Sequence, residues 1–294
     1  MEARPLTVAT FNVKDLFEAG FAAKLTELAR HLDRAGADLV ALQEIGSERA
    51  LDALVARLAR CADYKHRLVG SPDRRGIRNA ILSTFPLEGA VVHERAALPF
   101  PVFTPGDPEP FGARIPLRRG IPEVTVRHPT LGKVTMLSVH LKSKRPQAAK
   151  TSSAEEIPIT TPHDLAAAEV RSLVARLAEA LFVRGLVDAA TARGAEIVCA
   201  GDLNDTAESL PVGLIRGRGA AALVSAAAGL PGGERVSALH GAPAQIDHLL
   251  VSPTLASRLV EARFFNEDLR EHPHADDAPP TPDSDHALFM ARFE

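Results

Sequence analysis

The sequence predicts an α/β fold in which two mixed sheets pack face to face and helices cover their outer faces. Three observations support this prediction. The chain opens with two apolar, strand-like runs, each followed by a segment with helical spacing. The middle of the chain carries short apolar runs that favour antiparallel strands. A strongly periodic helix follows, and apolar strand-like runs resume towards the C-terminus.

The first third of the chain alternates strands and helices. Predicted strands at 6–11 and 38–43 end at Asn12 and Glu44. Apolar residues recur at helical spacing over 17–35, and Gly36 ends that pattern. Ser47 can cap a second helix, because its hydroxyl can accept a hydrogen bond from a first-turn amide.

The middle and the last third supply the remaining elements. Short strands are predicted at 66–70, 79–83, 89–94 and 114–116, and a hairpin joins 121–128 to 134–141 through a turn at 129–133. The polar, aperiodic stretch 142–161 is expected to be a long loop beside the functional site. A helix at 164–181 follows, then strands at 195–200, 245–251 and 287–293, with a Pro- and Asp-rich loop at 272–283.

Composition sets broad limits on function. Hydrophobic residues make up 46% of the chain and charged residues 24%, which is ordinary for a globular protein. The net charge of −3 gives no general attraction to nucleic acid or anionic membrane. Two cysteines provide no disulfide framework. No segment is long and apolar enough to span a membrane, and the start has no signal-peptide pattern, so we expect a cytoplasmic protein with one domain over 1–294.

The most informative motif is Gly201-Asp202-Leu203-Asn204, which follows an apolar strand. Side chains two residues apart point the same way along an extended chain. Asp202 and Asn204 are therefore expected to face one site, where the carboxylate would hold a water and the amide a phosphate oxygen.

Asn12 and Glu44 end the first two strands. Glu44 suits a hard divalent cation, and Asn12 can orient a metal-bound carboxylate or donate to a phosphate oxygen. Taken alone, each has a simpler explanation: an acid at a helix N-terminus for Glu44, and a turn or cap residue for Asn12.

Three further motifs carry histidines or acids. Alternation places His140 and Lys142 on one face of a strand, where His140 can contact a phosphoryl oxygen, although a structural histidine is an equal alternative. Asp247 lies within an apolar strand and needs a partner, for which His286 is the candidate and an ordinary ion pair with an arginine or lysine is the alternative. Asp285 is a candidate metal ligand.

The order of these motifs resembles the endonuclease/exonuclease/phosphatase superfamily, which includes deoxyribonuclease I, AP endonucleases, inositol-phosphate 5-phosphatases and neutral sphingomyelinases. The resemblance runs from Thr10-Phe11-Asn12 to Ser284-Asp285-His286. It implies a four-layer α-β-β-α sandwich of two stacked mixed sheets, and a site that uses Mg²⁺ or Mn²⁺. It also implies the following roles: metal binding by Glu44, Asn12 and Asp285, activation of water by Asp202, phosphate or leaving-group contacts by Asn204, His140 and His286, and support of His286 by Asp247.

Departures from the pattern narrow the subfamily. AP endonucleases commonly carry Asp or Asn where this chain has Lys14, and the 5-phosphatases carry a tryptophan motif that a chain without Trp lacks. The deoxyribonuclease pattern fits better, although no acidic partner for His140 is evident near Arg78-Asn79.

Basic residues suggest the substrate. Arg78, Arg118, Arg119 and Lys142 could grip phosphates that flank the cleaved bond, although solvated surface charge is an equal alternative. With Phe 12, Tyr 1 and Trp 0, aromatic platforms for single-stranded bases are scarce. The leading hypothesis is a metal-dependent nuclease acting on DNA. The alternatives are a hydrolase of a small or lipid phosphoester and, third, a non-catalytic phosphate-binding module.

Overall fold

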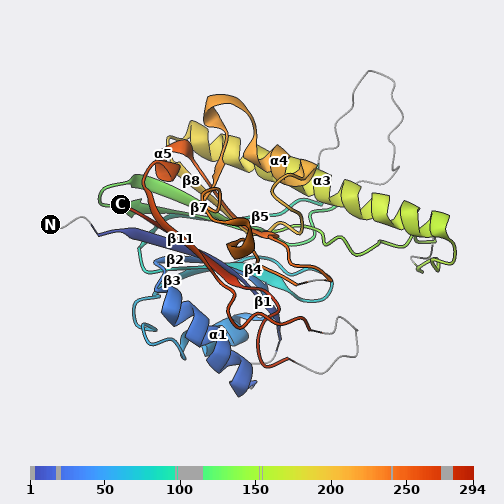
Figure 1. Ribbon diagram of the computed structural model, residues 1–294, viewed down its shortest axis with the longest axis horizontal. Coiled ribbons are helices and arrows are strands. Elements are labelled where there is room, and N and C mark those ends of the chain that lie inside the picture. Colours follow the sequence, from blue (N-terminus) through green and yellow to red (C-terminus); the bar gives the residue numbers. More distant parts are fainter. Residues whose placement is uncertain are drawn as a thin grey trace.

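The computed structural model describes residues 4–17, 21–96, 98, 115–151, 153, 155–239, 241–272 and 281–294. Two six-stranded sheets pack face to face, and helices cover the outer face of each sheet (Figure 1). The predicted α/β class and the four-layer arrangement are confirmed. The first sheet has the order β11 (Leu259–Phe265), β12 (Leu288–Phe293), β1 (Leu6–Leu16), β2 (Leu39–Ile45), β4 (Arg78–Ser83) and β3 (His66–Val69). The second has the order β5 (Leu87–His93), β6 (Ile121–His128), β7 (Gly132–His140), β8 (Glu196–Asp202), β10 (Asp247–Val251) and β9 (Val224–Ser225).

Each sheet contains one parallel pair among antiparallel neighbours. In the first sheet β1 runs parallel to β2, and in the second β7 runs parallel to β8. A helix joins the strands of each pair: α1 (Ala22–Ala35) in the first and α3 (Pro162–Ala192) in the second. Parallel strands end on the same side of a sheet, so each pair delivers two polar strand ends to one edge.

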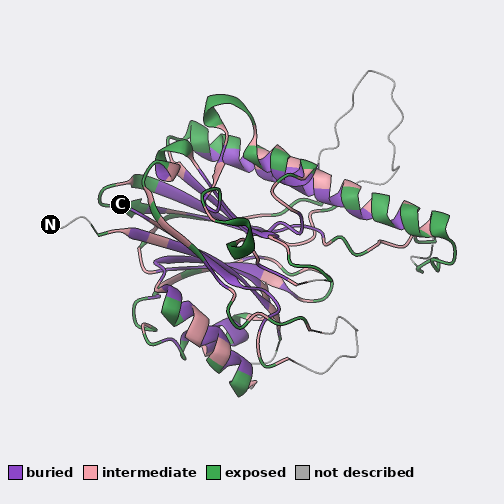
Figure 2. Cartoon of the chain, viewed as in Figure 1, coloured by how far each residue is buried: buried purple, intermediate pink, exposed green. Residues whose placement is uncertain are grey.

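Three apolar layers hold the elements together, as the burial of the strands in Figure 2 indicates. One layer lies between the first sheet and helices α1 and α2 (Glu48–Val55). The second fills the space between the two sheets, and includes Val8, Val198 and Phe289. The third joins the second sheet to α3 and α4 (Leu210–Arg216). The remaining helices are short: α5 (Pro253–Ala256) and the 3₁₀ turns Gly219–Ala221 and Gly232–Glu234.

The helix starts follow from their capping residues. The hydroxyl of Ser47 accepts a hydrogen bond from the amide of Ala50, as predicted. Thr161 and Asp164 form a reciprocal capping box at the start of α3. This helix extends 11 residues beyond the predicted end at 181, because Val183, Val187 and their neighbours pack on the second sheet and outweigh the low helix propensity of Gly185.

Three further predictions need correction. Strand β1 does not end at Asn12 but continues to Leu16 through an irregularity in which Lys14 and Asp15 adopt positive φ. Of the strand expected at 114–116, Arg114 lies outside the described residues, and 115–116 form an irregular connection because Pro116 has no amide hydrogen to donate. Strand β11 was not predicted, because an edge strand with mixed exposure lacks clear alternation.

Within the part of the chain that the structure describes, no helix has both the length and the apolar character needed to cross a bilayer.

Gly201, the first residue of the central motif, is required by the close approach of β7. A Cβ atom at Gly201 would lie 1.8 Å from the carbonyl oxygen of Val139, and its φ of 148° disfavours any side chain. We expect Gly201→Ala to destabilise the protein by about 3 kcal/mol or more in urea unfolding. Gly213→Ala is the matched control, because a Cβ there meets nothing within 4 Å and lies on a helix, so it should be neutral or stabilising by up to about 1 kcal/mol. Equal stabilities for the two variants would contradict this account.

Candidate active site

Asp202 lies at the centre of the polar edge that the two parallel pairs create. It is the last residue of β8 and is 2% exposed. One carboxylate oxygen, Oδ2, accepts a hydrogen bond at 3.1 Å from Nδ2 of Asn12, which comes from the opposite sheet. The other, Oδ1, accepts one at 2.8 Å from the amide of Asn204. The Nε2 atoms of His140 and His286 lie 3.5 and 4.0 Å from Oδ2.

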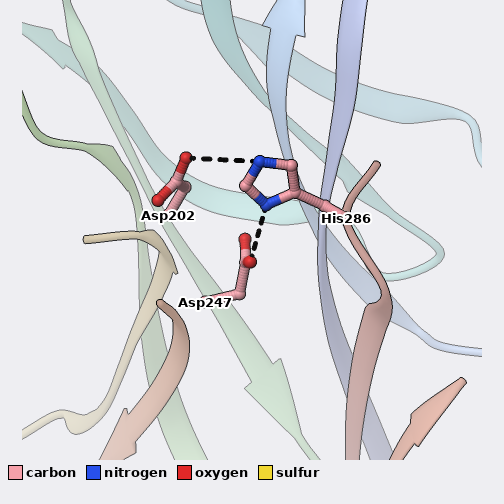
Figure 3. A group of neighbouring side chains, drawn as sticks. All are labelled: Asp202, Asp247 and His286. Atoms are coloured by element: carbon pink, nitrogen blue, oxygen red, sulfur yellow. Dashed lines mark hydrogen bonds and ion pairs between the residues drawn. The ribbon is translucent and has the colours of Figure 1, made fainter. Parts of the chain in front are cut away.

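Asp247 and His286 form a buried pair beside Asp202 (Figure 3). Nδ1 of the imidazole lies 2.8 Å from Oδ2 of Asp247, and its Nε2 faces Asp202. Burial would lower the pKa of His286, but the carboxylates of Asp247, Asp202 and Asp285 outweigh burial and raise it to about 10. The ring is therefore an imidazolium at neutral pH, held with one N–H directed at Asp202.

Asp202, Asp247 and His286 each offer one possible ligand atom, and these three atoms lie within 4.8 Å of one another, close enough to hold a metal ion. A protonated imidazole has no free lone pair, however, and Nδ1 of His286 is already bonded to Asp247. We therefore interpret these three residues as a hydrogen-bonded relay rather than a set of metal ligands.

His140 is in the opposite state. Burial, and secondly the charge of Arg119, lower its pKa well below the usual value, so the ring is neutral. Its Nε2 lies 3.5 Å from Asp202 and 3.9 Å from Glu44. Among the residues that the structure describes, Nδ1 of His140 has no hydrogen-bond partner, in agreement with the missing acid near Arg78-Asn79.

Glu44 has a second acid beside it that the sequence did not indicate. Its Oε1 accepts a hydrogen bond from Asn12, and its Oε2 accepts one at 2.9 Å from the amide of Asp15. Burial and the charge of Glu44 raise the pKa of Asp15 to about 6, against the effect of Arg75, which lies 2.6 Å away. Asp15 reaches the site only because the irregular backbone of β1 turns it there, which strand alternation does not predict.

Asn204 and Asp285 are close to the centre but are engaged by neighbours. Asn204 has a φ of 53°, so the extended alternation argued from the sequence does not continue past Asp202. Its side-chain amide donates to the carbonyl oxygen of Leu141. Asp285 pairs with the ammonium of Lys14 at 2.6 Å.

The four predicted phosphate-binding residues all make internal contacts. Arg78 donates to the carbonyl oxygen of Gly46 and Arg118 to the side chain of Gln147. Arg119 pairs with Asp73 and donates to the carbonyl oxygen of His140, and the ammonium of Lys142 is turned onto the loop carbonyls of Ser143 and Arg145. Their contact with substrate stays a prediction.

A model of the endonuclease/exonuclease/phosphatase family matches residues 9–286, a span that includes every residue of this site. The chain belongs to this family. Endonucleases, exonucleases and phosphatases all hydrolyse phosphoesters, so the polar edge around Asp202 belongs to a phosphoester hydrolase fold. The resemblance inferred from the order of the motifs is thereby confirmed. No curated protein matches the chain in sequence.

Several solved structures share this fold at low sequence identity. Truncated TDP2 from Caenorhabditis elegans is 18% identical, with a TM-score of 0.62 over 98% of this chain and 97% of that one. The 3′ phosphatase NExo from Neisseria, bound to product DNA hairpin, is 19% identical with a TM-score of 0.60 over 98% and 99%. A mannosyl-6-phosphatase from Bacteroides thetaiotaomicron is 16% identical with a TM-score of 0.61 over 97% and 98%. At these identities the likeness establishes the family fold.

The environment of Asp202 predicts an unusual dependence of stability on pH. Burial, and secondly the charge of Asp247, raise the pKa of Asp202 to about 7, well above the ordinary value for an aspartate. A carboxyl group whose pKa is higher in the folded than in the unfolded state makes the protein less stable as the pH rises from the unfolded-state pKa to the folded-state pKa. In EDTA, Asp202→Asn should therefore become more stable than the wild type above pH 8, by on the order of 1–3 kcal/mol, with a smaller difference at pH 4.

The matched control for this experiment is Asp247→Asn. It removes the carboxylate that holds His286 protonated, so we expect it to be less stable than the wild type at pH 5–8. Urea unfolding at pH 4, 6 and 8.5 measures both variants. If the difference between Asp202→Asn and the wild type does not change with pH, the raised pKa of Asp202 is refuted.

Proposed function

We propose that the protein is a divalent-metal-dependent nuclease that hydrolyses DNA phosphodiester bonds by attack of water. The observation that carries this proposal is the position of Asp202, a buried carboxylate between a charged imidazole and a neutral one at the edge where both sheets end. Phosphoryl transfer chiefly requires that the phosphate and the attacking water are positioned and that the charge on the phosphate oxygens is neutralised. The polar side chains at this edge can do both.

The donors beside Asp202 suit Mg²⁺ or Mn²⁺. Glu44 and Asp15 offer carboxylate oxygens, the ligands that these hard cations prefer, and Asn12 holds the carboxylate of Glu44 by donating to it through Nδ2. Burial, and secondly the charge of Glu44, raise the pKa of Asp15, and a dication would relieve the repulsion between these two carboxylates. When bound, the metal would supply positive charge that polarises the phosphoester and lowers the pKa of water.

The protein side chains divide the remaining work. Asp202 can accept a proton from an attacking water, because its pKa of about 7 is close to working pH. The imidazolium of His286 can donate to a phosphoryl oxygen as its negative charge grows, and Asp247 keeps that ring charged. The neutral ring of His140 can contact the leaving oxygen, and Asn204 would steady the phosphate.

Exposed cations on both sides of the centre favour a long phosphate backbone as the substrate. Arg75, which is bonded to Asp15 next to Glu44, has a side chain 58% exposed. Lys144, on the loop that follows β7, is also 58% exposed and pairs with Asp205. Arg75 lies in the turn between β3 and β4 of the first sheet, and Lys144 follows β7 of the second, so they could hold phosphates on either side of the cleaved bond.

A second candidate function is hydrolysis of a small phosphoester. A cavity of about 540 Å³ opens beside His286 and Ser284, and Arg30 and Arg270 line it. This volume is typical of small-molecule sites. The likeness in fold to a mannosyl-6-phosphatase from Bacteroides thetaiotaomicron supports this candidate.

The test is a panel of plasmid, linear DNA, RNA and small phosphoesters, incubated with Mg²⁺, Mn²⁺ or EDTA. We expect metal-dependent nicking of plasmid that EDTA abolishes. Asp202→Asn should lower the rate by about 10³-fold or more, because a base and a fixed charge are both lost. Asp188→Asn is the matched control and should keep full activity, because Asp188 is an exposed acid near the end of α3, where the chain enters β8 at the end opposite Asp202.

Each outcome of this panel has one meaning. Turnover of small esters with intact plasmid would support the second candidate. Nicking that survives Asp202→Asn would reject the proposed role of Asp202. If the protein shows no metal-dependent turnover of any substrate in the panel, both functions are rejected.

A further inference from the structure

Lys14 places a fixed positive charge inside the candidate active site. Its ammonium lies 2.6 Å from Oδ2 of Asp285, and the two side chains are only 13% and 2% exposed. Asp285 adjoins His286, whose ring faces Asp202. The charge is therefore part of the same polar edge rather than of the outer surface.

The backbone of β1 is shaped to hold this lysine in place. Lys14 and Asp15 adopt φ values of 46° and 47°, which are unfavourable for residues other than glycine. Asn12 stabilises the turn, because its side-chain oxygen accepts a hydrogen bond from the amide of Lys14. Local strain of this kind persists only where surrounding contacts impose it.

A second lysine fixes the same turn from the other side. Lys24 of α1 is 4% exposed, and its ammonium donates to the carbonyl oxygen of Lys14. Burial lowers the pKa of Lys24 to about 8, whereas the acids Asp15, Asp285 and Glu44 act to raise it. The turn that carries Lys14 is thus anchored by a buried cation that lies among the acids of the site.

The acids of the site consequently fall into two groups. The ammonium of Lys14 contacts one carboxylate oxygen of Asp285 at 2.6 Å, so it lies where a metal ion bound to that oxygen would lie. Glu44 and Asp15 form a like-charged pair, and the guanidinium of Arg75, which pairs with Asp15, is largely exposed. A dication placed at Asp285 would meet the charge of Lys14, whereas a dication placed between Glu44 and Asp15 would relieve repulsion.

We propose that the ammonium of Lys14 is a built-in cation that takes the place of a second metal ion at Asp285, so that the site binds a single divalent cation on its Glu44 side. The inference rests on the proposed metal-dependent function. The sequence predicted that Asp285 is a metal ligand. In this proposal Asp285 instead holds the ammonium of Lys14.

The test is the number of Mn²⁺ ions bound per full-length chain, measured by electron paramagnetic resonance of free Mn²⁺ during titration. The wild type should bind one Mn²⁺. Lys14→Met, which keeps the length of the side chain without its charge, should bind two, and adding Asp285→Asn to it should return the number to one. Lys14→Arg keeps the cation and should bind one.

A second variant keeps the test decisive if Lys14→Met does not fold. Asp285→Asn alone should bind one Mn²⁺ with an affinity within about threefold of the wild type, because Asp285 is not a ligand, whereas Glu44→Gln should lose tenfold or more. Two Mn²⁺ on the wild type, one on folded Lys14→Met, or a tenfold loss in Asp285→Asn would each overturn the inference. A wild type that binds one Mn²⁺ but hydrolyses nothing would overturn the proposed function and leave the role of Lys14 intact.

Discussion

The hydrogen bond from Asn12 to Asp202 is the contact on which the geometry of the site depends. It joins Asn12, where the regular pairing of β1 with β2 stops, to the end of β8 in the other sheet. Beneath it, Gln43 donates to the hydroxyl of Ser138, so a polar contact between the sheets continues into the apolar interior. A buried carboxylate is costly without such partners, and the cost is met only when the two sheets stack in this register.

The balance of charge inside the fold separates structural acids from those available for chemistry. Asp205 is paired with Arg176, Asp247 with His286, and Asp285 with Lys14, each at 2.9 Å or less. Glu44 and Asp15 are neighbouring carboxylates, as are Asp202 and Asp247; burial, and secondly the neighbouring negative charge, raise the pKa values of Asp15 and Asp202. The uncompensated negative charge is thus concentrated where a dication and a phosphoester would meet, as expected of a functional site.

The sequence allowed much of the fold to be predicted, because apolar runs and capping residues act locally. It also indicated which polar residues follow strands, and the structure brings Asn12, Glu44, His140, Asp202 and His286 to one edge. It did not indicate Asp15 or the position of Lys14, because a turn with positive φ at non-glycine residues follows no periodic pattern. Nor could it separate solvated cations from those tied to backbone carbonyls, such as Lys142, because those partners are set by the path of a loop.

The two histidines beside Asp202 show how the fold can assign different chemistry to identical side chains. Both rings are buried and both direct Nε2 at the same carboxylate. His286 has Asp247 on its other nitrogen and stays charged, whereas His140 has the charge of Arg119 nearby and stays neutral. Environments that push two pKa values apart distinguish a charge-stabilising donor from a neutral contact. Burial acts to lower the pKa of both rings, so the neighbouring charges decide the difference: Asp247 in β10 keeps His286 charged, whereas Arg119, in the connection before β6, adds to the effect of burial at His140.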